Sequence, residues 1–204
     1  MTAFVTFIVT VDPFGVAPLF VGLTASASAA DRRRLAVSGV VIGSAILIVF
    51  ALVGEPLLRA LGIGLPAFRI AGGILLLLLA IDMVMARQSG LRATTEGEEA
   101  ESQSRSDIAV FPLGIPLIAG PGAITSVVLL VGQARGDIAE QGAVIGVLVA
   151  VLILTLVCLL LAGHLMRLLG VTGINVISRV SGIIVAALAV QFMIDGLRAV
   201  FPLT

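Results

Sequence analysis

Long runs of apolar residues dominate this sequence, and they restrict the chain to a small set of folds. The runs cover residues 3–24, 36–54, 66–86, 108–132, 142–163 and 174–197. One helix needs roughly 20 apolar residues to cross a bilayer core about 30 Å thick, so each run is long enough to span it. None of the runs alternates apolar and polar residues as the strands of a membrane β-barrel do. The sequence therefore predicts an all-α membrane protein with six transmembrane helices.

The composition agrees with this fold class and excludes several functions. Of the 204 residues, 59% are hydrophobic and 12% are charged, whereas roughly a quarter of the residues of a soluble domain are charged. The 12 basic and 12 acidic residues cancel, so the chain lacks the basic surface that a nucleic-acid-binding protein needs. One cysteine and one histidine cannot build a metal site based on those ligands.

The arginines predict how the chain is oriented in the membrane. The longest connection, 87–107, is polar and rich in glutamate, and we expect it to be a cytoplasmic linker. With six spans, eight of the 12 arginines fall on the side of this linker and four on the other side. Because arginine is enriched in cytoplasmic loops, we expect a plasma-membrane protein with both termini outside. The first run lacks the preceding basic residues of a signal peptide, so we expect it to be a helix of the mature protein.

Short motifs recur at a nearly constant spacing. Pro13 matches Pro121 at an offset of 108 residues. The other two matches pair Leu57–Ile63 with Leu165–Val171 at an offset of 108, and Arg69–Gly72 with Arg179–Gly182 at an offset of 110. Three matches in the same order predict two repeats of three helices each, at 1–86 and 108–204, joined by the linker.

The number of spans in each repeat determines how the two repeats are oriented. A unit of three spans ends on the opposite side of the membrane from where it begins, so its copy is inverted. Inverted repeats characterise many secondary transporters, which bind their substrate near the bilayer midplane at the interface between the repeats. The sequence therefore predicts a secondary transporter.

The first helix of each repeat contains residues that interrupt a helix near its centre. These are Asp12, Pro13, Phe14 and Gly15 in the first repeat, and Gly120, Pro121, Gly122 and Ala123 in the second. Proline costs about 3 kcal/mol in a helix interior, and in hydrocarbon the freed backbone groups need protein or a watery cavity around them. Freed N–H groups suit a carboxylate and freed carbonyls suit an ammonium, so these residues form the predicted binding site for a zwitterion. The alternative is a pair of proline kinks that serve only packing.

Charged residues within the spans are candidates for supporting roles. A carboxylate at the depth of Asp12 is costly unless it is paired or solvated, so Asp12 is a candidate to contact the substrate ammonium or to carry a coupling proton. The alternative is that Asp12 only caps the helix that begins at Pro13. Arg69 and Arg179, at equivalent repeat positions, and Asp82 are the candidate supporting residues. The arginines either pair with freed carbonyls or carboxylates, or extend to the membrane interface.

The residues that enzymes need are missing from this sequence. It contains no phosphate loop and no zinc-protease motif, and its single His164 offers no Ser-His-Asp set. We therefore expect no catalytic activity, no metal and no cofactor. The remaining alternative to a transporter is a scaffold or regulatory protein embedded in the membrane, which would bind no amino acid.

The ordered combination of four motifs resembles the MarC family of multi-pass membrane proteins, which includes transporters of small neutral amino acids. The motifs are Asp12–Phe20, Phe68–Leu75, Phe111–Ile124 and Ile177–Gly182. The resemblance covers essentially the whole chain and implies a six-helix fold built from inverted halves. It also implies transport of glycine, alanine and similar amino acids. Whether a proton or a sodium ion drives transport, which direction it takes and how many subunits assemble stay open.

Overall fold

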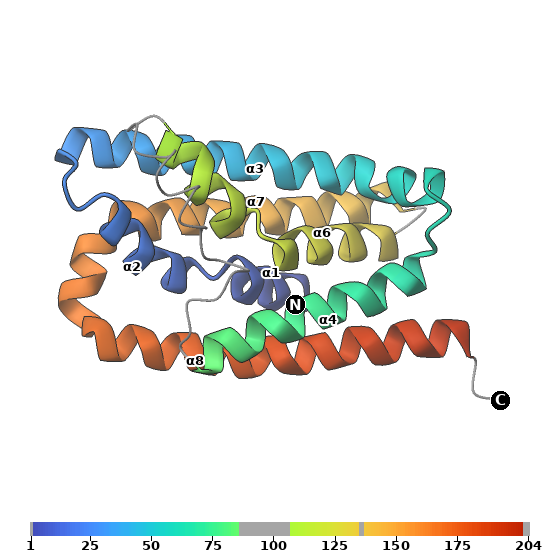
Figure 1. Cartoon of the computed structure of the whole chain (residues 1–204). Coiled ribbons are helices and arrows are strands. Elements are labelled where there is room, and N and C mark those ends of the chain that lie inside the picture. Colours follow the sequence, from blue (N-terminus) through green and yellow to red (C-terminus); the bar gives the residue numbers. More distant parts are fainter. Residues whose placement is uncertain (1, 86–106, 135–136, 202–204) are drawn as a thin grey trace.

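The computed structural model describes residues 2–85, 107–134 and 137–201, and these ranges contain helices and connections without any strand. The helices are α1 (Thr2–Val11), α2 (Pro13–Leu23), α3 (Ala29–Ala60), α4 (Leu65–Met85), η1 (Asp107–Ala109), η2 (Val110–Ile118), α6 (Pro121–Gln133), α7 (Ile138–Leu160) and α8 (Ala162–Val200). Together they form an elongated bundle (Figure 1). The predicted linker lies outside the described residues except for Asp107, its last residue.

Five helical stretches of the described chain are long and apolar enough to cross a bilayer. The first of them, Thr2–Leu23, combines α1 and α2. A sixth is obtained when η2 and α6, which meet at an angle of 51°, are taken as one bent span. The prediction of an all-helical protein with several apolar spans is therefore confirmed.

Two helices extend beyond the apolar runs that predicted them. The run at 36–54 belongs to α3, which begins at Ala29 because the Ser28 side chain caps it by accepting the Asp31 N–H at 3.1 Å. The run at 174–197 belongs to α8, which begins at Ala162 and bends at Gly170, where φ is 64°. An apolar run marks the part of a helix that lies in the membrane, whereas caps and glycines set where the helix begins, bends and ends.

Glycines bring α4 and α8 into close contact. A Cβ atom on Gly73 would lie 2.6 Å from Cγ of Met193, and one on Gly182 would lie 2.8 Å from Cβ of Met83. Residue numbers rise along α4 while those of its contacts fall along α8, so the two helices are antiparallel neighbours, as Figure 1 also shows. Small residues allow this approach, which favours helix association in membranes.

The innermost helices of the bundle are α1, α2 and α6. In the most apolar 18-residue stretch of Thr2–Leu23, 56% is buried inside the bundle, whereas the corresponding share in the other four long spans is 28% to 39%. Ten of the 13 residues of α6 are buried as well. The outer helices expose large apolar side chains, among them Val41, Leu52 and Ile183, as expected for surfaces that face lipid.

The connections alternate between the two ends of the bundle. Figure 1 shows the α2–α3 and α7–α8 connections at one end, and the α3–α4 connection and the end of α8 at the other. This alternation is what a chain that crosses a membrane repeatedly requires. The arginine-rich start of α3 and Arg167, at the beginning of α8, therefore lie towards the same end. Which end faces the cytoplasm stays a prediction.

Candidate functional site

The helical path is interrupted between α1 and α2 at Asp12. This residue has a left-handed backbone, with φ 51° and ψ 65°, and its side chain is almost fully buried. Its Oδ1 accepts the Gly15 N–H at 3.1 Å, and Pro13 occupies the first turn of α2. The interpretation that Asp12 caps this helix is therefore confirmed. Because Pro13 has no N–H, the Val9 carbonyl of α1 loses the donor that a continuous helix would supply.

Gly15 is required by the position of the Asp12 carboxylate. A Cβ atom on Gly15 would overlap the Asp12 Oδ2 atom, so a larger residue would displace the cap. Pro13 is buried, whereas Phe14 and Gly15 are half-buried. The first interruption is thus a compact turn that is stabilised by its own residues.

The second interruption lies between η2 and α6. Gly120 is the N-cap of α6 and makes no side-chain capping bond, and Pro121 follows in the first turn. Pro121 has no N–H, so Gly122 and Ala123 carry the first backbone donors of α6, and these have no acceptor within the helix. A Cβ atom on Gly120 would lie 2.6 Å from the Pro116 carbonyl oxygen. The first turn of α6 therefore has the backbone geometry of an anion site.

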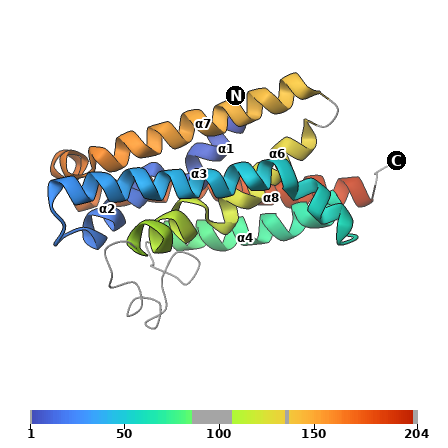
Figure 2. The ribbon, with the colours of Figure 1, turned by 90° about the horizontal axis from the view of Figure 1, so that it is seen from above.

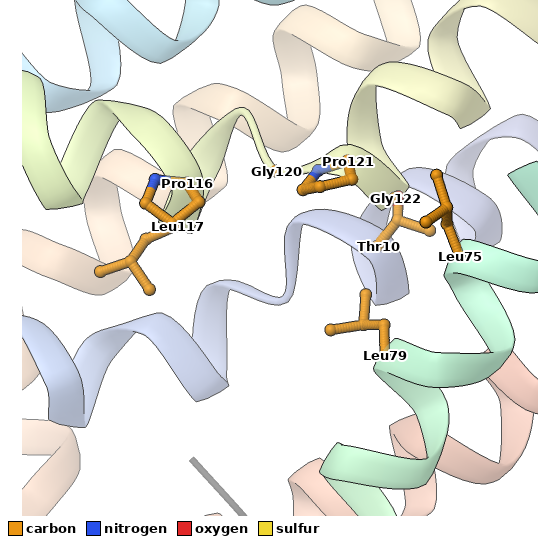
Figure 3. A pocket seen from close by; sticks show the side chains of 8 residues that line it. All are labelled: Thr10, Leu75, Leu79, Pro116, Leu117, Gly120, Pro121 and Gly122. Atoms are coloured by element: carbon orange, nitrogen blue, oxygen red, sulfur yellow. The ribbon is translucent and has the colours of Figure 1, made fainter. Parts of the chain in front are cut away.

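A small cavity of about 10 Å³ lies where these elements meet (Figure 3). The residues that line it come from α1, α4, η2, α6 and the connection between η2 and α6; they are Thr10, Leu75, Leu79, Pro116, Leu117, Gly120, Pro121 and Gly122. This volume has room for about one water molecule. In this conformation the cavity is therefore too small to hold an amino acid.

The structure brings only part of the predicted site to this cavity. Gly120, Pro121 and Gly122 line it, and Gly122 packs so closely that a Cβ atom there would lie 2.9 Å from Leu76 Cδ2. Five predicted residues do not line it; they are Asp12, Pro13, Phe14, Gly15 and Ala123. The first interruption contributes instead through Thr10, two residues before Asp12.

The predicted supporting residues stand apart from the cavity. Arg69 is half-buried, and its Nε atom is buried without a hydrogen-bond partner. Arg179 is exposed and Asp82 is half-buried. None of the three lines the cavity.

Buried hydroxyl groups near the cavity were missed by the sequence reasoning. Thr10 Oγ1 donates to the Thr6 carbonyl oxygen at 2.8 Å, whereas Thr6 Oγ1 and Ser126 Oγ are buried without a partner. The signal that would have found the threonines is their spacing. Thr2, Thr6 and Thr10 recur every four residues in an otherwise apolar helix, which places them on one face.

Comparisons with known proteins place this chain among membrane proteins. Residues 1–201 match the family model described as MarC family integral membrane protein. A UPF0056 membrane protein of Methanocaldococcus jannaschii is 40% identical over 92% of this chain and 90% of its own. The UPF0056 membrane proteins YhcE of Escherichia coli and YvbG of Bacillus subtilis are each 34% identical. The alignments cover 94% and 98% of this chain, and 88% and 94% of the relatives. No solved structure matches.

Proposed function

Because this chain belongs to the MarC family of integral membrane proteins, we propose that it is a secondary transporter of small neutral amino acids of the glycine and alanine type. It works in the plasma membrane with both termini outside. The observation that carries this proposal is the cavity inside the bundle between Thr10, near the end of α1, and the interruption at the start of α6. Broken helices at such a place are the usual substrate sites of secondary transporters.

The backbone around the cavity matches the two charges of an amino acid. The N–H groups of Gly122 and Ala123 begin α6 and suit the substrate carboxylate. The last carbonyls of α1, including that of Val9, lie at the negative end of that helix and suit the ammonium. Leu76 and Leu79 approach Gly122, so the site has room for a small side chain only.

An inverted repeat is the architecture that we propose for this transporter, and two pairs of backbone features support it. Pro13 and Pro121, 108 residues apart, each occupy the first turn of a helix that follows an interruption. Gly62 and Gly170 are also 108 residues apart, and they have similar positive φ values of 72° and 64°. Gly62 lies in the connection after α3 and Gly170 at the bend within α8, so each precedes the last long apolar segment of its half.

The contact between α4 and α8 supports the same relation. At the sequence offset of 110, Met83 corresponds to Met193 and Gly72 to Gly182. Gly182 packs on Met83, and Gly73, the neighbour of Gly72, packs on Met193. A two-fold axis produces such reciprocal contacts, because residue i touches j and the equivalent of j touches the equivalent of i.

Transport then requires that the cavity widens. A volume of about 10 Å³ excludes an amino acid, so one repeat moves relative to the other and exposes the site to each side in turn. During this movement Asp12 keeps the turn between α1 and α2 in place through its hydrogen bond with the Gly15 N–H. The ion that is transported together with the amino acid is a proton or a sodium ion.

A thermal-shift measurement on the purified protein tests the binding part of this proposal. Glycine or alanine at about 100 times the dissociation constant adds about 2.7 kcal/mol of stability, which raises Tm by several degrees. We expect Gly122→Leu to abolish this shift, because the new side chain fills the cavity that Gly122 lines.

The control for this measurement is Gly146→Leu. A Cβ atom on Gly146 in α7 would meet nothing within 4 Å, so the shift should remain. If the protein is instead a scaffold or regulatory protein, no amino acid should shift its Tm. That outcome, or a full shift in Gly122→Leu, would refute the proposed site.

A further inference from the structure

Thr6 and Ser126 differ from three other buried threonines of the bundle in how their hydroxyls are satisfied. The Oγ1 atoms of Thr10, Thr24 and Thr155 donate to the carbonyl four residues earlier, at 2.7 to 2.8 Å. This is the usual arrangement for a hydroxyl inside a helix. Thr6 Oγ1 and Ser126 Oγ have no partner, although both residues are fully buried. These two hydroxyls are therefore available to a ligand.

The two hydroxyls lie at the same level of the bundle, next to the cavity. The helices α1 and α6 pack against each other, and they run in opposite directions in both Figure 1 and Figure 2. Thr10 of α1 and Gly122 of α6 line the same cavity. Thr6 is one helical turn before Thr10, and Ser126 is one turn after Gly122. Because the helices are antiparallel, both steps of about 5.4 Å lead in the same direction.

The chemistry of this pair favours a neutral polar ligand over a cation. A hydroxyl both donates and accepts a hydrogen bond, so the hydroxyls of Thr6 and Ser126 suit a ligand that carries a hydroxyl of its own. A buried cation is stabilised by carboxylates or by freed backbone carbonyls. Neither α1 nor α6 contains an acidic residue, and the freed carbonyls of α1 lie at its C-terminal end. Asp12 lies beyond the cavity from Thr6, and its Oδ1 accepts the Gly15 N–H.

We propose that Thr6 and Ser126 form a subsite for the side-chain hydroxyl of serine. The inference rests on the proposed function, because the substrate carboxylate lies at the first turn of α6 and its ammonium at the end of α1. Its side chain then extends one turn away from the cavity, towards Thr6 and Ser126. Serine therefore satisfies two hydroxyls that glycine and alanine leave without a partner, and it binds more tightly than alanine.

Equilibrium binding of glycine, alanine and serine to the purified protein tests this subsite. Thr6→Val and Ser126→Ala each remove one hydroxyl with little change of volume. We expect each substitution to lower the ratio of serine affinity to alanine affinity about tenfold, since a polar group loses its partner. The affinities for glycine and alanine stay as in the unmodified protein.

Two further variants separate the subsite from general effects on folding. Thr155→Val removes a hydroxyl that is equally buried but donates to the Val151 carbonyl, and it should leave the ratio unchanged. Thr6→Ser keeps the hydroxyl and should keep the serine preference.

The outcomes distinguish failure of the serine subsite from failure of the proposed transport function. An unmodified protein that binds alanine as tightly as serine, or a ratio unaffected in Thr6→Val and Ser126→Ala, overturns the serine subsite. Binding of glycine and alanine in that case leaves the proposed function intact. If none of the three amino acids binds, the proposed function fails and the subsite fails with it.

Discussion

Asp12 combines two roles that are usually separate. Its backbone takes the left-handed conformation that ends α1, and its side chain begins α2 by accepting the Gly15 N–H. Asp and Asn tolerate this conformation better than other residues with a side chain. The pattern Asp-Pro-Phe-Gly therefore encodes a turn between two helices within one span, and it requires no substrate to stabilise it.

Substitution of Asp12 separates the contribution of the cap from that of the charge. Asp12→Ala removes the acceptor and places alanine at φ 51°, so we expect the free energy of unfolding to fall by about 1–3 kcal/mol. Asp12→Asn keeps the acceptor and tolerates the backbone, so its stability stays within about 0.5 kcal/mol. Thermal unfolding in detergent measures the stability of both variants. An Asn variant as unstable as the Ala variant would show that the charge is essential.

Sequence reasoning could predict part of the site at this scale. Pro121, Gly120 and Gly122 stood out because they are strong helix breakers inside an apolar run, and they line the cavity. Thr6 and Ser126 did not stand out, because Ser and Thr in a membrane helix commonly bond to their own backbone. Only the three-dimensional contacts distinguish a hydroxyl with a partner from one without.

At the scale of helices, glycines determine which elements approach each other. Gly73 and Gly182 allow α4 and α8 to meet, and Gly72 meets Thr125 of α6. The apolar runs predicted where the helices cross the membrane, because burial in lipid requires apolar side chains over about 20 residues. They could not predict the starts of α3 and α8, since these depend on the Ser28 cap and on the bend at Gly170.

Gly182→Ala tests the close packing of α4 and α8. The added Cβ would lie 2.8 Å from Met83 Cβ and 3.1 Å from the Val84 backbone nitrogen, and neither atom can move without shifting α4. We expect the free energy of unfolding to fall by about 1–3 kcal/mol. In the control Gly163→Ala, on the same helix, the Cβ meets nothing within 4 Å, and stability stays equal or rises by up to about 1 kcal/mol. Equal Tm changes in the two variants would contradict this account of the interface.

At the scale of the whole molecule, the proposed inverted halves place α1 and α6 in the middle of the bundle, surrounded by helices that face lipid. The sequence predicted the inverted halves from three short matches and from the odd number of spans per repeat, but not which helices lie in the middle. It could not predict that the cavity would be too small for an amino acid, because that depends on how Leu76 and Leu79 of α4 pack against Gly122.

The most direct test of this account is glycine counterflow in proteoliposomes. Unlabelled glycine inside the vesicles exchanges for labelled glycine outside, so the assay does not depend on which ion drives transport. We expect labelled glycine to accumulate in vesicles that contain the unmodified protein or Gly146→Leu, but not in protein-free vesicles or in those with Gly122→Leu. Folded protein that accumulates no more glycine than protein-free vesicles, or Gly122→Leu that exchanges at the unmodified rate, would contradict it.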